Sequence, residues 1–83
     1  MNLDIEDKLE DLYQLYFRVE YKNPRLYTIH FEILQNSIDF DYNYDENLTF
    51  NANIDIIQKI INKKIIEILG GPNEKYRANR NNQ

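Results

Sequence analysis

The 83-residue sequence contains no cysteine and no tryptophan, and it has only two glycines and two prolines. Without cysteine, the chain forms neither a disulfide framework nor a thiolate metal site. No apolar run approaches the roughly 20 residues of a membrane-spanning helix, and the acidic N-terminus does not resemble a signal peptide. A chain this short forms one domain with a small core. We therefore expect a soluble cytoplasmic protein with no membrane partner.

The charge is distributed unevenly, although the net charge is only −4. Residues 1–55 hold twelve acidic and four basic residues, a net −8, whereas residues 56–83 hold two acidic and six basic residues, a net +4. An acidic body repels nucleic-acid phosphates. Direct nucleic-acid binding is therefore not expected.

Residues 3–21 have the apolar period of a helix. Acidic residues crowd its first turns, where the helix dipole favours them, and Asn23-Pro24 ends the pattern. The apolar residues recur at steps of three and four and share one stripe, namely Ile5, Leu9, Leu12, Tyr16 and Val19.

Residues 25–34 and 38–44 alternate apolar and polar side chains, which predicts two half-buried strands. A two-residue turn at Gln35-Asn36 would pair them as a hairpin. In that register Phe31 lies opposite Phe40, His30 opposite Asp41, and Glu32 opposite Asp39.

Apolar and polar residues also alternate over residues 48–56, and we interpret this segment first as a third strand. A three-residue loop at 45–47 would lead into it. The alternative is that the segment starts a helix. Residues 56–69 have a helical period, which Gly70-Gly71-Pro72 ends. The predicted fold class is α+β, in the order α-β-β-β-α, with a three-stranded antiparallel sheet and both helices on one face. We expect a single domain at residues 1–71 and a flexible basic tail at 72–83.

The last helix has an apolar arc that is wider than one sheet face needs. Its central stripe holds Ile57, Ile61, Ile65 and Ile68. Three isoleucines lie beside or beyond that stripe, namely Ile56, Ile60 and Ile66. Either the helix is buried between the sheet and the first helix, or this flank forms a homodimer interface with a second copy of the chain.

The acidic segment 38–46, IDFDYNYDE, copies part of a calcium-binding loop. Asp39, Asp41, Asn43 and Asp45 have the spacing of the first ligands of an EF-hand, but Tyr44 replaces its glycine and residue 50, a phenylalanine, replaces its bidentate glutamate. The sequence therefore predicts no metal and no cofactor. The remaining alternative is a weak cation site between Asp39 and Asp41 and the amides of residues 51 and 53.

The sequence predicts no catalytic residues, and we do not expect an enzyme. His30 is the only histidine, and Ser37, the only serine, falls near the predicted turn. No nucleophile accompanies the histidine, and the two glycines end a helix instead of forming a phosphate-binding loop.

The predicted order of elements over residues 3–69 resembles the double-stranded-RNA-binding domain, and LEDLYQLY (residues 9–16) is similar to the first helix of that family. The family binds RNA through a basic start of its last helix. Residues 53–58 read NIDIIQ at that place, and the first helix is acidic, so RNA binding is not implied for this chain.

The acidic row has a spacing that suggests another role. Side chains two residues apart on a strand are roughly 6.6–6.8 Å apart, and successive phosphates of one nucleic-acid strand are separated by roughly 6–7 Å through space. Asn51 and Asn53 beside the acids would supply hydrogen bonds without repulsion. In size, acidity and lack of cysteine, the chain resembles the small acidic DNA-mimic inhibitors of phages and mobile elements.

This resemblance implies an inhibitor that takes over a basic host protein, such as a nucleoid-associated protein, a polymerase or a nuclease. The alternative is a homodimeric adaptor or an immunity-type protein without nucleic-acid mimicry. The acidic residues predicted to contact the partner come from the first helix and the strand region, namely Asp4, Asp7, Asp11, Asp39, Asp41, Asp45 and Glu46.

Overall fold

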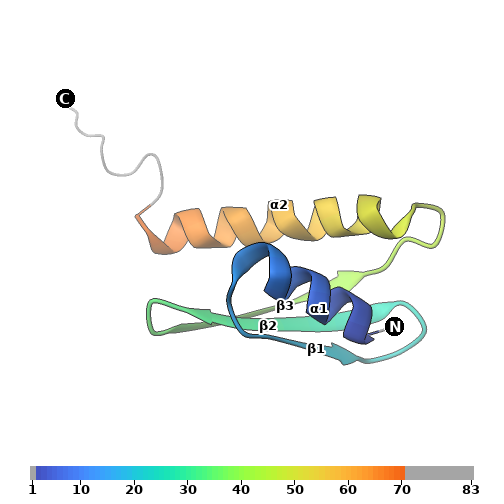
Figure 1. Cartoon of the computed structure of the whole chain (residues 1–83), viewed down its shortest axis with the longest axis horizontal. Coiled ribbons are helices and arrows are strands. Elements are labelled where there is room, and N and C mark those ends of the chain that lie inside the picture. The colour runs from blue at the N-terminus through green and yellow to red at the C-terminus, as the bar shows by residue number, and fades with distance from the viewer. Residues whose placement is uncertain (1, 71–83) are drawn as a thin grey trace.

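The computed structural model describes residues 2–70, so residue 71 and the predicted tail at 72–83 lie outside the described residues. Three strands form an antiparallel sheet in the order β1-β2-β3, and Figure 1 shows both helices on the same side of it. The predicted α+β class and the α-β-β-β-α order are confirmed. The elements are α1 (Asn2–Tyr13), β1 (Phe17–Tyr21), β2 (Leu26–Ile33), β3 (Asn36–Asn43) and α2 (Phe50–Ile68).

A single apolar core lies between the helices and one face of the sheet. Both helices and all three strands contribute buried side chains, and alternate residues of each strand point into the core. The other face of the sheet is covered by neither helix and carries polar side chains. The buried core residues are Ile5, Leu9, Phe17, Val19, Tyr27, Ile29, Phe31, Tyr42, Ile54, Ile57 and Ile61.

The first helix is shorter than residues 3–21, and the prediction that it reaches residue 21 is wrong. Gln14 adopts a left-handed backbone with φ 58°, and its N–H donates to the Glu10 carbonyl at 2.8 Å, which terminates α1. Residues 17–21 form β1 instead, in which Phe17 and Val19 are buried. Tyr16, placed on the helical stripe, is 65% exposed. The alternation of Phe17 and Val19 was the signal for a strand.

The prediction of a third strand at residues 48–56 is also wrong, because α2 begins at Phe50. Thr49 is the N-cap residue, and its hydroxyl accepts a hydrogen bond from the Ala52 N–H at 3.0 Å. In the helix, Ile54 joins Ile57 and Ile61 in the core, whereas a strand would have extended the sheet. The alternative interpretation, a helix start, is the correct one.

The pairing of β2 with β3 is shifted by two residues from the predicted register. The hairpin loop is Leu34-Gln35, so Phe31 faces Ile38 and Ile29 faces Phe40. A shift of two residues leaves each side chain on its predicted face, because the period of a strand is two. The polar neighbours do change, since Asp39 faces His30 and Ser37 faces Glu32. The predicted repulsion between Glu32 and a directly opposed Asp39 is therefore absent.

The hairpin turn offers a stabilising substitution. Leu34 and Gln35 have φ values of 51° and 65°, a left-handed conformation that costs residues with a Cβ about 1–2 kcal/mol each. Replacing them with Asn and Gly, the preferred pair for such a turn, should raise the free energy of unfolding by about 1–2 kcal/mol. Urea unfolding with an unchanged slope would measure the gain. The neighbouring Asn36→Gly variant lies in β3 and should gain nothing; an equal gain there would contradict this explanation.

Candidate functional site

Two of the predicted acids stand on the uncovered face of the sheet. Asp39 and Asp41 are exposed residues of β3, which is an edge strand. The Thr28 hydroxyl donates to Asp41 Oδ1 at 2.8 Å. His30 lies between two carboxylates, with Nδ1 3.8 Å from Asp39 Oδ2 and Nε2 3.6 Å from Glu32 Oε2. This face therefore orients the two aspartates by hydrogen bonding and by a neighbouring imidazole.

The next two predicted acids continue along the chain after β3. Asp45 and Glu46 are exposed in the loop that leads to α2, where they line an open pocket together with Arg25. Asp45 Oδ1 accepts a hydrogen bond from the Asn47 N–H at 2.9 Å, which orders the turn. Asp39, Asp41, Asp45 and Glu46 thus follow one edge strand and its loop, and we name these four residues the acidic edge.

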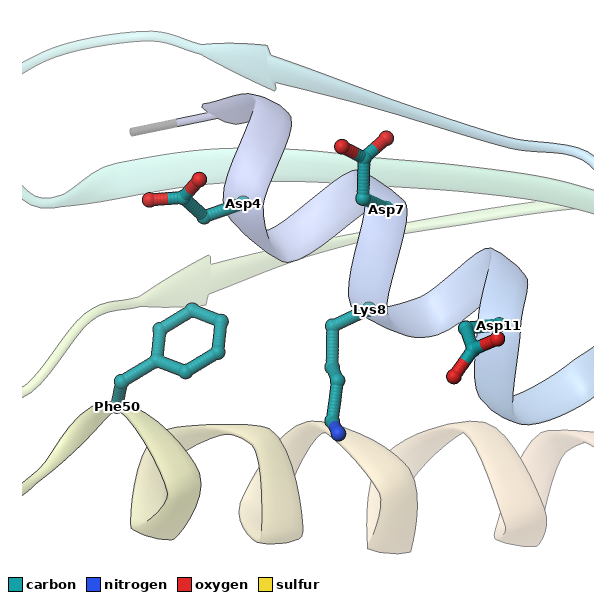
Figure 2. A pocket seen from close by; sticks show the side chains of 5 residues that line it. All are labelled: Asp4, Asp7, Lys8, Asp11 and Phe50. Carbon is teal, nitrogen blue, oxygen red and sulfur yellow. The ribbon is translucent and has the colours of Figure 1, made fainter.

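The remaining predicted acids form a separate surface. Asp4, Asp7 and Asp11 are exposed residues of α1, and together with Lys8 and Phe50 they line an open pocket beside α2. Figure 2 shows Lys8 pointing toward α2 while Asp7 points away from it. Because α1 packs on the core face of the sheet, these three acids lie on the opposite side from Asp39 and Asp41. The seven predicted acids therefore make two surfaces and not one.

Asn53 does not offer its amide on the acidic surface as predicted, because it is fully buried at the start of α2. Its Oδ1 accepts hydrogen bonds from the Tyr42 hydroxyl at 2.6 Å and from the Asp45 N–H at 2.9 Å. Its Nδ2 donates to the carbonyls of Asp45 and Thr49, both at 3.0 Å. Burial, followed by the charges of Asp45 and Tyr44, raises the pKa of Tyr42 above its ordinary value, which further favours the protonated hydroxyl that donates here.

The buried amide of Asn53 is not available as a ligand for the weak cation site that the sequence suggested. All of its hydrogen-bonding capacity is used inside the domain, so it has none left for an ion shared with Asp39 and Asp41. What the amide does instead is hold the loop that carries Asp45 and Glu46 against the core. Asn53 is therefore a supporting residue for one end of the acidic edge.

Sequence reasoning missed the role of two glutamates of α1. Glu6 Oε1 accepts a hydrogen bond from the Val19 N–H at 2.9 Å, and Glu10 Oε2 accepts one from the Phe17 N–H at 3.1 Å. These donors belong to the outer edge of β1, with which no further strand of residues 2–70 pairs. The available signal was the i, i+4 spacing of the two glutamates, which places them on one side of the helix.

The predicted dimer flank of α2 is only partly available. Ile56 is 37% exposed and Ile66 is 45% exposed, but Ile60 packs against the core. A substitution at Ile60 would therefore disturb the fold as well as any contact between copies. The flank that can meet another molecule is limited to Ile56 and Ile66.

Neither a metal centre nor a membrane span is seen in the described part of the chain. Within residues 2–70, no three side chains of His, Cys, Asp or Glu are grouped so that they could hold a metal ion. No helix of these residues is long and apolar enough to cross a membrane. In comparisons with protein-family models, curated proteins and solved structures, nothing matches this chain. The chemistry of the acidic edge is therefore the basis for assigning a function.

Proposed function

We propose that this chain is a small acidic interaction protein, an inhibitor that presents a nucleic-acid-like negative surface to a basic nucleic-acid-binding protein. It acts by binding and not by catalysis. The observation that carries the proposal is the acidic edge, in which Asp39 and Asp41 are exposed two residues apart on the edge strand β3 and Asp45 and Glu46 follow in the adjoining loop.

The geometry of this edge supports the proposal in two ways. The strand holds Asp39 and Asp41 roughly 6.6–6.8 Å apart, which is comparable to the phosphate spacing along one strand of nucleic acid. The sheet is anchored on the core, so Asp39 and Asp41 present their charges without the entropy loss of ordering a loop on binding. Complementary charge of this kind speeds association and selects for a basic partner.

Charge reversal on the acidic edge should weaken binding. We expect the double substitution Asp39→Lys and Asp41→Lys to lower the affinity for a basic DNA-binding partner at least tenfold, because two attractive contacts become repulsive. The partner would be captured from host lysate on the immobilised full chain, eluted with a salt gradient and identified by mass spectrometry. Added duplex DNA should displace it, since DNA and the acidic edge would occupy the same groove.

A matched control has the same charge change on the other side of the sheet. Asp7 and Asp11 were predicted to contact the partner, but α1 holds them on the opposite side of the sheet from the acidic edge, so the proposed contact leaves them out. The double substitution Asp7→Lys and Asp11→Lys should therefore change the affinity much less. Equal losses in both double variants would point to net charge alone and contradict the proposal. So would a partner that DNA does not displace.

The alternative, a homodimeric adaptor or an immunity-type protein, has the exposed side chains of Ile56 and Ile66 in its favour. A contact through these residues would be apolar and insensitive to salt. If sedimentation shows self-association that Ile66→Glu abolishes, and no partner is released by salt, this alternative replaces the inhibitor.

A further inference from the structure

The two edges of the sheet differ in how their backbone groups are satisfied. On the β1 edge, the N–H groups of Phe17 and Val19 donate to carboxylates of α1. On the β3 edge, no side chain or loop of residues 2–70 makes a comparable bond to the outward-facing backbone. An uncovered edge presents donors and acceptors that can pair with another strand.

The hydrogen-bond register shows which residues of β3 face outward. The Tyr44 N–H donates to the Arg25 carbonyl at 2.8 Å, so this pair is bonded across the hairpin. In an antiparallel ladder every second pair is bonded. The backbone groups of Tyr42, Phe40 and Ile38 therefore face β2, and those of Asp39 and Asp41 face the open edge.

The side chains along the open edge are different on the two faces of the sheet. The side chains of Asp39 and Asp41 project from the face of the sheet that no helix covers. Every second side chain of an added strand would lie on this same face, beside them. Ile38 and Phe40 project to the core face and are only partly buried. Lys64 of α2 lies over the Phe40 ring, 5.7 Å from its centroid. An added strand would therefore meet two carboxylates on one face and apolar surface on the other.

We propose that β3 binds an extended segment of the basic partner as a fourth strand, with Lys or Arg at alternate positions and apolar residues between them. This inference rests on the proposed function and specifies that the part of the basic partner that binds is an extended strand. Main-chain hydrogen bonds to Asp39 and Asp41 would give affinity, and their carboxylates would select the basic residues. A second copy of the chain fits this edge poorly, because antiparallel β3 strands would oppose the same aspartates.

Amide hydrogen exchange on the ¹⁵N-labelled full chain tests the added strand. The probe is a six-residue peptide in which lysine alternates with valine, capped at both ends. We expect the amides of Asp39 and Asp41 to exchange freely in the protein alone and at least tenfold more slowly with saturating peptide. The amides of Phe17 and Val19 serve as internal controls, because their carboxylate partners are already in place.

Backbone methylation of the peptide separates strand pairing from charge attraction. In an antiparallel added strand, the lysines opposite Asp39 and Asp41 direct their N–H groups toward β3, and the valines direct theirs away. Peptides N-methylated at all lysines or at all valines keep the same charge. One of the two methylated peptides should lose at least tenfold in affinity, while the other binds like the unmethylated peptide. If the added strand is antiparallel, the peptide methylated at its lysines is the one that loses affinity.

Two results would overturn the added strand. If both methylated peptides bind like the parent peptide, charge alone is recognised, and the proposed function stands without strand pairing. If the amides of Asp39 and Asp41 are already protected in the protein alone, the chain itself or a second copy covers the edge. Failure of the proposed function is recognised separately, because the Asp39→Lys and Asp41→Lys variant would then bind its basic partner unchanged.

Discussion

Replacing Asn53 with alanine is expected to lower the free energy of unfolding by about 3 kcal/mol, because it removes four hydrogen bonds at a fully buried position. The Tyr42 hydroxyl and the Asp45 N–H would lose their acceptor, and the Asp45 carbonyl would lose its donor. A buried polar group without a partner costs about 1–3 kcal/mol. The loss is a large fraction of the stability of a domain of this size.

Thermal unfolding followed by circular dichroism would measure the effect of Asn53→Ala. A loss of about 3 kcal/mol corresponds to a fall in Tm of roughly 12–24 °C for a domain of 60–100 residues. Asn51→Ala is the matched control, because Asn51 is an exposed asparagine two residues earlier on the same helix. A similar small shift in both variants would show that the network around Asn53 does not hold the loop.

The double substitution Glu6→Ala and Glu10→Ala is expected to lower the free energy of unfolding by about 2–4 kcal/mol. Each glutamate accepts a hydrogen bond from an edge N–H of β1, at 2.9 Å and 3.1 Å. Hydrogen bonds that involve a charged group contribute about 1.5–3 kcal/mol each, and partial exposure lowers that value. The substitution also uncovers the β1 edge, so it should promote association between chains.

The control for the glutamates is Asp7→Ala together with Asp11→Ala, which removes the same charge from exposed positions of the same helix. Urea unfolding should show a change within about 0.5 kcal/mol for this control. Glu6→Gln with Glu10→Gln should restore part of the loss, since an amide oxygen still accepts. If the aspartate and glutamate variants lose equal stability, general charge effects account for the result and the edge bonds do not.

Much of the fold could be predicted because short-range alternation determines which side chains a strand buries. Ile29 and Phe31 were expected on the core face, and they are fully buried. The predicted hairpin register was wrong, but it differs from the observed register by two residues, so each side chain was still assigned to the correct face of the sheet. The turn itself was missed because Leu34 and Gln35 are poor residues for a left-handed backbone, whereas Asn36 is a better one.

The candidate surface was predicted in part for the same reason. Exposure of Asp39 and Asp41 follows from strand alternation, and exposure of Asp45 and Glu46 follows from their position after the strand. The separation of these residues from Asp4, Asp7 and Asp11 required the packing of α1 on the opposite face of the sheet. Strand alternation predicted which face of the sheet the helices cover, but it did not show which way the exposed acids of α1 point once that helix is packed.

The sequence by itself determined the α+β class, the β2–β3 hairpin with the faces of its two strands, and the location of the acidic row, because these depend on the periodicity of neighbouring residues. The predicted α-β-β-β-α order matched only because a strand missed before the hairpin and a strand wrongly placed after it compensated. Only the tertiary structure decided that residues 17–21 form a strand and that residues 50–56 form a helix, since each segment satisfies both periods over so short a length. It also decided the functions of Asn53, Glu6 and Glu10, because their partners other than Thr49 lie 7 to 13 residues away along the chain. Such polar contacts form only when packing removes water and brings donor and acceptor together.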